Sequence, residues 1–496
     1  MKRYILGVDQ GTTGVAVLLF DEQWRQVARG YAEIRQIYPQ NGWVEHDAED
    51  LWEAVCSATA QAIELGAVDP REIVGVGLDH EGESVVLWDA ETGKPLGNTL
   101  VWQDRRTAAA AEALEAEHGA LFRERTGLAV DSYFSALKLQ WLLNNTPNAR
   151  ELMASGRLRA GTMDAWLVWK LTGGARHITD VSTASRTMLM NVKTEDWDDD
   201  LLQILGIPRQ ILPTVCDSTS LFGNTVPEAF CGIAAPIGGV LADQQAALLG
   251  QACFTPGSVK TTYGTGCFLL MNTGDTPTPS KHGLISTTAW RIGGRTTYAL
   301  DGGVYIAGAA TGWLRDGLKI IRSASETEEM ALRAGSNGGV YFVPAFTGLA
   351  APYWDSYARG TMLGITGGTT REHIVRATLE ATAYQVYDLT KLMEQESQTP
   401  IQVMRCDGGA VANRFLMQFQ ADLLGIPLHI PTITDTTALG AAFAAAIGLG
   451  WYSSPEELTP FWQLSHCYEP HMSADERDSL LHDWHRAVER ARNWAK

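Results

Sequence analysis

Two short segments, far apart in the chain, combine residue types that can hold a phosphate group. The first, 5–21, places Gly11-Thr12-Thr13-Gly14 between two apolar stretches, and the second, 261–270, places Gly264-Thr265-Gly266 in the same way. Glycines permit a tight turn, and its backbone amides together with threonine hydroxyls form a concave anion site. Taken alone, the first segment is better explained as an ordinary β-hairpin. The two together predict a duplicated architecture that closes on one nucleotide.

Two aspartates stand at positions where a strand ends. Asp9 closes the first apolar stretch and offers hard oxygen atoms, which Mg²⁺ prefers, next to the phosphate turn. Its plainer interpretation is a cap on that turn. Asp243 follows the predicted strand 238–242 at the point where a helix begins. By itself this position predicts a helix N-cap, a common place for aspartate.

The length and charge of the chain limit its organisation and its partners. A chain of 496 residues is too long for one hydrophobic core, so we expect two domains, 1–250 and 251–496. The formal net charge of −18 argues against nucleic acid or an anionic membrane as a partner, because both would repel the protein. A small neutral substrate fits this charge better.

Cysteine usage and apolar stretches indicate where the protein works. Seven cysteines are scattered along the chain without a CxxC pair, which disfavours a zinc site or a disulfide framework and is typical of a reducing cytoplasm. The chain runs directly into its first expected strand, and we expect no signal segment. The longest run of small apolar residues, 438–451, is too short to span a membrane, and we expect a buried, closely packed helix there.

Apolar spacing predicts further elements in both halves. Polar residues 79–83 follow a buried strand, at the place where open α/β sheets bind ligands. The last helix begins at a capping box of Ser473 and Glu476, and we place Trp494 on its apolar face. The other expected elements are strands 24–34, 73–78, 85–88 and 100–102, a helix from Asp47 or Asp50, and a long helix over 378–393.

Several longer stretches resemble one protein family and follow one another in its order over nearly the whole chain. On these stretches the chain resembles the FGGY carbohydrate kinases of the sugar-kinase/Hsp70/actin superfamily, and most closely its glycerol-phosphorylating members. The resemblance implies an α/β protein of two duplicated ribonuclease-H-like domains with a nucleotide cleft between them. Besides the two Gly-Thr turns, the matching stretches are 38–47, 101–107, 133–143, 242–247, 346–355, 360–380 and 407–413.

The resemblance implies roles at an alcohol site. Asp243 would accept the proton of the substrate hydroxyl and would also contact the metal. Gln244 and Glu83 would bind the hydroxyl groups of the substrate. The apolar walls that orient its carbon chain would be Trp102, Tyr133 and Phe268.

The resemblance also implies ATP and Mg²⁺, with Asp9 holding the metal through water. Gly408-Gly409 would contact adenosine, although the same pattern fits a simple strand-to-helix turn. Homodimers and homotetramers are common in this family. The residues expected at the nucleotide are Thr12, Thr13, Gly264, Thr265, Gly266, Gly408, Gly409 and Asn413.

Two positions depart from the family pattern. Glycerol-phosphorylating members carry arginine at the place of Gly82, within the run His80-Glu81-Gly82-Glu83. We expect this exchange to remove a hydrogen-bond donor, to leave a hole that admits a longer polyol, and to add negative charge at Glu81. The family usually places Arg or Lys at the slot of Ala16, so a cation near the phosphates is missing. Losing such a group can lower the rate about a hundredfold or more.

We therefore expect an ATP- and Mg²⁺-dependent kinase that phosphorylates a terminal hydroxyl of glycerol, giving glycerol 3-phosphate and ADP. One alternative is a kinase for another polyol or a ketose, such as erythritol, xylitol or xylulose. A second is a catalytically weakened nucleotide- or polyol-binding protein. Gly82 and Ala16 favour that second alternative, whereas Asp9, Asp243 and Thr265 disfavour it, because a pure binder has no need of a base.

Overall fold

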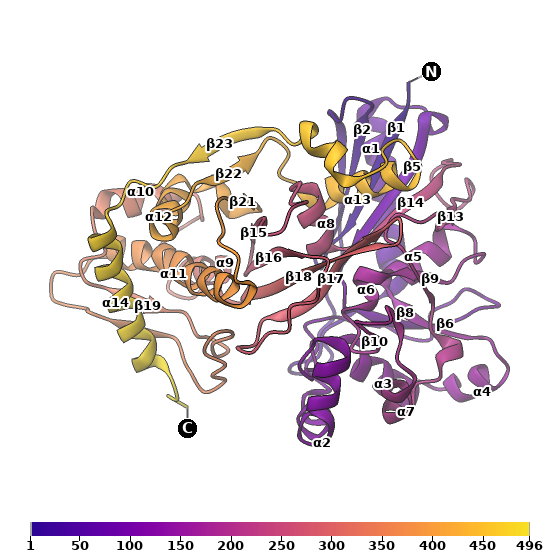
Figure 1. The fold of residues 1–496 in the computed structure, drawn as a ribbon, viewed down its shortest axis with the longest axis horizontal. Helices are drawn as coiled ribbons and strands as arrows, with labels where there is room; N and C mark the ends of the chain where they lie inside the picture. Colours follow the sequence, from indigo (N-terminus) through magenta and orange to yellow (C-terminus); the bar gives the residue numbers. More distant parts are fainter. Residues whose placement is uncertain (1, 496) are drawn as a thin grey trace.

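The computed structural model describes residues 2–495 as two lobes, each built around a mixed β-sheet (Figure 1). The first half of the chain, indigo to magenta, lies at the right of Figure 1, and the orange lobe of the second half lies at the left. Each central sheet contains a hairpin whose first strand also pairs with a parallel strand. This repeated order confirms the predicted α/β fold with two similar halves.

The first sheet has six strands in the order β13-β14-β5-β1-β2-β3. β1 pairs antiparallel with β2 and parallel with β5, which pairs parallel with β14. Because β1, β5 and β14 run in the same direction, their carboxyl ends meet at one edge, where Asp9, Asp79 and Asp243 stand. The strands are β1 Tyr4–Gln10, β2 Gly14–Asp21, β3 Gln26–Glu33, β5 Ile73–His80, β13 Gly223–Asn224 and β14 Pro236–Ala242.

The second sheet has seven strands in the order β17-β18-β16-β15-β21-β22-β23. Here β15 takes the place of β1, because it pairs antiparallel with β16 and parallel with β21. Its register places Thr262 beside Asp407, as the first sheet places Asp9 beside Asp79. The strands are β15 Val259–Tyr263, β16 Cys267–Gly274, β17 Ile285–Ile292, β18 Arg295–Val304, β21 Met404–Asp407, β22 Leu428–Pro431 and β23 Leu464–Tyr468.

Two helices, α8 (Asp243–Gly250) and α13 (Thr436–Gly448), pack against each other where the lobes meet. Although α13 comes from the second half of the chain, it packs on β1, β5 and β14 of the first sheet (Figure 1). Small residues permit the close contact between α13 and α8, because a Cβ added at Gly440 would collide with the backbone of Ala246. The predicted buried helix within 438–451 is confirmed, and it connects the two lobes.

The first half also carries a four-stranded sheet, β4-β7-β6-β8, and smaller strand pairs lie in both halves. Those strands are β4 Glu45–His46, β6 Val85–Asp89, β7 Thr99–Leu100, β8 Leu158–Thr162, β9 Ile178–Asp180, β10 Met190–Asn191, β11 Asp196–Trp197, β12 Thr214–Cys216, β19 Tyr341–Val343 and β20 Thr361–Leu363. The remaining helices are α1 Ala48–Gly66, α2 Ala108–Thr126, α3 Ser135–Asn145, α4 Ala149–Ala154, α5 Met163–Leu171, α6 Val181–Ala184, α7 Asp199–Leu205, α9 Gly308–Asp316, α10 Glu326–Ala334, α11 Arg371–Ser397, α12 Arg414–Leu424 and α14 Ala474–Ala491.

Some predicted boundaries differ from the structure. The strand expected at 100–102 is only the two-residue β7, and the helix expected over 378–393 is the longer α11. The placement of Trp494 on the apolar face of the last helix is wrong, because α14 ends at Ala491 and Trp494 is 71% exposed. No helix within residues 2–495 is long and apolar enough to cross a membrane.

Candidate active site

The first predicted phosphate turn joins β1 to β2 where the two lobes meet. The amide N–H of Gly11 donates to the carbonyl oxygen of Gly14 at 3.0 Å, and Thr13 is exposed at the tip. The indole N–H of Trp102 donates to the Thr12 hydroxyl oxygen at 2.9 Å. This turn is therefore attached directly to a residue of the predicted alcohol site.

The second predicted phosphate turn joins β15 to β16. Its Gly264 N–H donates to the Gly266 carbonyl oxygen at 2.8 Å, and Gly264 and Thr265 are exposed. The amides of Ala307 and Ala309 both donate to the Thr265 carbonyl oxygen at 3.0 Å. Because these amides belong to the start of α9, a helix N-terminus holds the second turn, whereas Trp102 contacts the first.

Two carboxyl groups of the first lobe face each other at the edge of the sheet. Burial raises the pKa of Asp9, and the Thr437 hydroxyl donates to its Oδ2 at 2.6 Å. Burial, followed by the charge of Asp9, raises the pKa of Asp79 well above its usual value. Both oxygens of Asp79 are buried with no donor beside them, so these two carboxyls can share one proton.

Asp243 is the first residue of α8, whose N-cap is Ala242. Its Oδ1 accepts the amide N–H of Gln244 at 2.6 Å. Burial, then the charge of Glu83, raises the pKa of Asp243 to about 7, and the opposite charge of Lys260 limits this shift. A carboxyl group with a pKa near neutrality is suited to accept a proton and release it again. The interpretation as an N-cap is wrong, and the geometry fits a general base.

Lys260 brings a cation to this cluster from the second lobe. Its ammonium donates to Gln244 Oε1 at 2.5 Å and to Thr262 Oγ1 at 3.1 Å, and the residue is fully buried. Burial lowers the pKa of Lys260, whereas Asp407 and Asp243 favour its charged form. Sequence reasoning missed this residue. Its signal was a charged side chain directly after the apolar Val259, within a strand that pairs on both sides.

The slot of Ala16, where the family usually places Arg or Lys, lacks a cation as expected. Ala16 is buried and packs in a cluster with residues of α13, so its side chain belongs to the core between sheet and helix. Gln244, predicted to bind a substrate hydroxyl, has its side-chain oxygen on Lys260. Lys260 of β15 therefore brings a cation to the site that the first hairpin lacks.

The structure brings the three predicted wall residues together. The ring of Trp102 lies 5.7 Å from that of Tyr133 and 6.5 Å from that of Phe268, measured between centroids, both in edge-on contact. Phe268 belongs to β16 of the second lobe, so the wall is built by both halves of the chain. Burial, then the charge of Glu83, raises the pKa of Tyr133 well above its usual value, which keeps its hydroxyl neutral.

The expectation of a hole at Gly82 is wrong. A Cβ added at Gly82 would lie 3.3 Å from Cγ of Arg186 and 3.2 Å from Cβ of Ala242, so the space is filled. Arg186 also donates through Nε to Oε1 of Glu83 at 2.7 Å, so a guanidinium group lies beside this predicted alcohol-site residue. Sequence reasoning missed Arg186, although it is the sole charged residue in the stretch 181–192.

The added charge of Glu81 lies behind the first turn. Glu81 is 2% exposed, and its Oε1 is 3.5 Å from Nδ1 of His46. The other ring nitrogen of His46 contacts the side-chain oxygen of Gln36 at 3.0 Å. The side-chain amide of Gln36 in turn donates to the Thr12 carbonyl oxygen at 2.7 Å. Glu81 therefore lies two side chains away from the first predicted phosphate turn, and its carboxylate oxygens accept no hydrogen bond from the residues that the structure describes.

The predicted adenosine residues lie beside the second turn. Gly408 has a φ of +88°, and an added Cβ would lie 2.5 Å from the Tyr263 carbonyl oxygen, so only glycine fits. The missing Cβ of this glycine makes room for the backbone of β15. A Cβ added at Gly409 would meet nothing within 4 Å. Asn413 caps α12 and donates to Thr327 Oγ1 at 3.1 Å.

The carboxylates fit Mg²⁺ that arrives with a nucleotide. The unpartnered oxygens of Asp79, beside Asp9, are hard ligands of the kind that Mg²⁺ takes. Within residues 2–495, however, no three His, Cys, Asp or Glu side chains are arranged to hold a metal ion. Mg²⁺ in kinases is commonly held by one or two carboxylates, water and the phosphates themselves. The donor set therefore fits a shared metal and not an ion held by protein alone.

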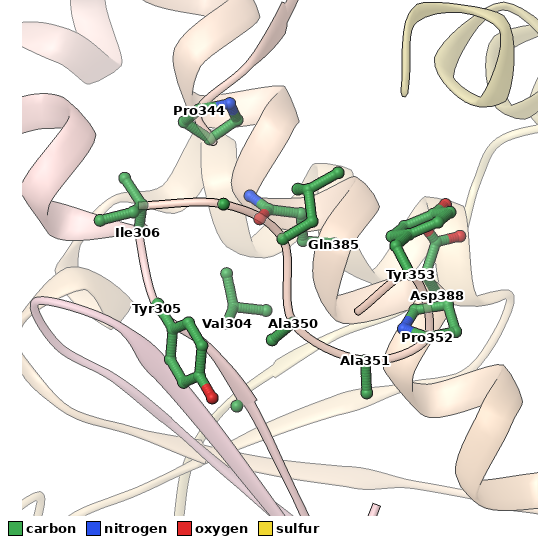
Figure 2. A pocket seen from close by; sticks show the side chains of 13 residues that line it. Val304, Tyr305, Ile306, Pro344, Ala350, Ala351, Pro352, Tyr353, Gln385 and Asp388 are labelled. Atoms are coloured by element: carbon green, nitrogen blue, oxygen red, sulfur yellow. The ribbon is translucent and has the colours of Figure 1, made fainter. Parts of the chain in front are cut away.

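A small cavity in the second lobe lies close to the predicted alcohol site, because Gly303, which lines it, packs against the ring of Phe268 (Figure 2). Its volume is about 20 Å³, room for about one water molecule. Asp388 at its edge accepts the Tyr353 hydroxyl and the Trp484 indole N–H, both at 2.8 Å. None of the predicted site residues lines it, and its paired polar groups indicate a structural role.

Two family models match the chain: the FGGY family of carbohydrate kinases, N-terminal domain, over residues 4–250, and its C-terminal domain over 259–449. Glycerol kinase 2 of Thermotoga maritima is 51% identical over 495 residues, covering 100% of both chains. The glycerol kinase of Symbiobacterium thermophilum is also 51% identical, covering 100% of this chain and 99% of that protein.

Solved structures agree with these matches. Plasmodium falciparum glycerol kinase with ADP has a TM-score of 0.92 at 33% identity, covering 99% of this chain and 98% of that one. A ligand-bound xylulose kinase from Lactobacillus acidophilus has a TM-score of 0.86 at 22% identity, covering 98% and 97%, and shares the fold. Two lobes of this topology, with a buried aspartate between them, define a kinase with the two-domain sugar-kinase fold. The chain belongs to the FGGY family of carbohydrate kinases.

Proposed function

We propose that this protein transfers the γ-phosphoryl group of ATP to a terminal hydroxyl of glycerol, giving glycerol 3-phosphate and ADP. The observation that carries the proposal is Asp243, a carboxyl at a strand end with a pKa of about 7, subject to the charges of Glu83 and Lys260. Relatives named as glycerol kinases at 51% identity support glycerol as the substrate.

In the proposed reaction, Trp102, Tyr133 and Phe268 orient the carbon chain of glycerol, and Glu83 accepts hydrogen bonds from its hydroxyl groups. Asp243 accepts the proton of the terminal hydroxyl. The oxygen of that hydroxyl forms a bond to the γ-phosphorus while the bond from this phosphorus to the β,γ-bridging oxygen breaks, and ADP leaves. Lys260 holds the side chain of Gln244, which lies next to the base and binds a hydroxyl group of the substrate.

For the nucleotide, we assign the phosphates to the space between the two turns. The exposed hydroxyl of Thr265 and the half-buried Thr12 support this assignment. Mg²⁺, held by Asp9 and Asp243, would supply positive charge that offsets the phosphates. The open space at Gly409, near Asn413, supports adenosine binding there. The domains in this assignment are 1–250 for the polyol and 251–496 for the nucleotide, with Thr13, Gly264, Gly266 and Gly408 completing the nucleotide site.

We also propose that the protein works in the cytoplasm as a homodimer or homotetramer. All seven cysteines are free thiols, which supports a reducing compartment. The oligomeric state follows from the family resemblance alone, and light scattering on the purified protein measures it directly.

The function is tested by ADP release from Mg-ATP with glycerol, erythritol, ribitol, xylitol, dihydroxyacetone and xylulose. We expect the highest kcat/KM with glycerol, and a loss in kcat of about a hundredfold to ten-thousandfold in Asp243→Asn, while ATP still stabilises that variant against heat. Asp199→Asn, an exposed aspartate at the start of α7, is the matched control and keeps full turnover.

Two results would contradict this assignment. A longer polyol or a ketose that exceeds glycerol in kcat/KM would replace glycerol as the substrate. Turnover of no substrate, with ATP still raising the unfolding temperature, would favour a nucleotide-binding protein that has lost kinase activity. The space at Gly82 is filled in the structure, so we do not expect a longer polyol to exceed glycerol. We also expect turnover, because Asp243 is retained.

A further inference from the structure

A buried arginine lies among the predicted alcohol-site residues and joins the two lobes. Arg186 follows α6 and is 2% exposed. Besides its bond to Glu83, its Nη2 donates to the Tyr133 hydroxyl oxygen at 3.3 Å. Its Nη1 lies 3.0 Å from Oδ2 of Asp301, which belongs to β18 of the second lobe. The guanidinium group of Arg186 therefore contacts two residues that are predicted to bind the substrate, Glu83 and Tyr133, and the carboxylate of Asp301 in the other lobe.

One edge of this guanidinium still has a donor to give. Nη1 of Arg186 is buried and makes no hydrogen bond of good geometry, although its charge is balanced by Asp301. The same guanidinium group donates through Nε to Glu83, whose carboxylate can accept further hydrogen bonds. An alcohol hydroxyl both donates and accepts, so a charged donor and a charged acceptor side by side match one hydroxyl group of a polyol.

The stem of Arg186 sets the length of the site at the same place. Its Cγ and Cβ lie 3.3 and 3.7 Å from the position of a Cβ added at Gly82. Glycine at this position is therefore what allows the arginine stem to pass close to the backbone. A carbon chain that extended toward Gly82 would meet this stem.

We propose that Arg186 is the cationic substrate-binding residue of the alcohol site and determines its specificity: with Glu83 it binds a polyol hydroxyl, and its stem restricts the site to a three-carbon polyol. The proposal rests on the function proposed above and deepens it, because it names the residue that selects the substrate. The ion pair with Asp301 makes this contact depend on the second lobe.

The test compares Arg186→Ala, Arg186→Lys and Gly82→Ala with the parent protein, with glycerol and erythritol as substrates. For Arg186→Ala we expect the KM for glycerol to rise about thirtyfold or more, because a buried donor is lost, while the KM for ATP stays within about twofold. The glycerol-to-erythritol ratio of kcat/KM should fall about tenfold or more as the stem is removed. Arg186→Lys keeps the charge but not the planar fork, and should restore only part of the affinity.

Arg186→Ala leaves Glu83 and Asp301 buried without their cation and could fail to fold for that reason. Gly82→Ala tests the same contact without removing the arginine. The added methyl group requires Arg186 to shift by a few tenths of an ångström. We expect the KM for glycerol to rise about threefold to tenfold in this variant, with an unchanged unfolding temperature. Arg209→Ala, an exposed arginine paired with Asp199, is the matched control and keeps both parameters.

The same experiment separates this inference from the proposed function. If the parent protein phosphorylates glycerol but Arg186→Ala and Gly82→Ala keep its KM and the glycerol-to-erythritol ratio within about twofold, only the inference is overturned. If the parent protein prefers another polyol, the glycerol assignment fails and the restriction to three carbons fails with it. Calorimetric titration of glycerol into the parent protein and both variants gives the affinity independently of turnover.

Discussion

The two lobes repeat one strand order but carry different charges at the matching edges. In the first lobe, Asp9 of β1 lies beside Asp79 of β5. In the second, the equivalent register places Thr262 of β15 beside Asp407 of β21, and the ammonium of Lys260 lies on Thr262. At these matching positions the first lobe therefore carries two carboxylates, whereas the second lobe carries one carboxylate and a cation, Lys260. The duplicated fold therefore sets the backbone positions, whereas a few side chains near the strand ends set the chemistry.

The two paired carboxyls also differ in how they are satisfied. Asp407 accepts hydrogen bonds at 2.6 Å from both Gln251 and Thr436, whereas Asp79 has no donor. The neighbouring Thr437 donates to Asp9. The first turn of α13 therefore bonds to Asp407 of one sheet through one threonine and to Asp9 of the other through the next. We infer that Asp407 is structural and that Asp79 belongs to the reacting side.

Among the variants of the second lobe, replacement of its cation, Lys260, should have the largest effect on kcat. We expect Lys260→Met to lower kcat about a hundredfold to a thousandfold, because the variant removes the positive charge from the cluster around Asp243. Steady-state kinetics with glycerol and Mg-ATP measure it. Lys391→Met, an exposed lysine paired with Glu394, is the matched control. A Lys260→Met protein with parental kcat would show that the site needs no cation from β15.

Disturbing the close contact between Gly408 and the backbone of Tyr263, behind the second turn, should destabilise the protein. Gly408→Ala forces a methyl group onto the Tyr263 carbonyl oxygen in a backbone conformation with φ of +88°, so we expect a loss of about 2 kcal/mol or more in the free energy of unfolding. Gly409→Ala is the internal control, because its added Cβ meets nothing within 4 Å and should change stability by about 0.5 kcal/mol at most. Urea denaturation compares the two, and equal losses would contradict the structure.

The two turns should respond differently when each loses a hydroxyl group. Thr265→Val should raise the KM for ATP about tenfold and leave the KM for glycerol unchanged, because Thr265 is exposed on a turn held by α9. Thr12→Val should raise both KM values about threefold to tenfold, since the Thr12 hydroxyl also holds the indole of Trp102. Identical effects of the two variants on both substrates would remove the distinction between the turns.

Sequence patterns predicted the parts of this site that depend on local structure. Gly-Thr turns between apolar stretches, and aspartates at strand ends, are recognisable because a hairpin and a strand end are formed by neighbouring residues. For this reason the two hairpins and the positions of Asp9 and Asp243 at strand ends agree with the structure.

The remaining features depend on which distant segments meet, and no local pattern carries that information. Arg186 fills the space at Gly82 although the two are far apart in the chain, and the hole expected from Gly82 alone is absent. Lys260 reaches Gln244 from the other lobe. The packing of α13 on the first sheet could not be predicted either, because its alanine-rich sequence fits any close helix contact. Buried charges in otherwise uncharged stretches were the usable signal.

We infer that Asp243 is the general base, with a pKa raised to about 7 by burial and by Glu83. The pH dependence of kcat/KM for glycerol tests it most directly, because this parameter reports the ionisation of the enzyme before the alcohol binds. Asp243 accepts a proton only when ionised, so we predict constant activity above pH 8 and a tenfold fall per pH unit well below 7. A kcat/KM that stays constant down to pH 5.5 would exclude Asp243 as the group that accepts the proton.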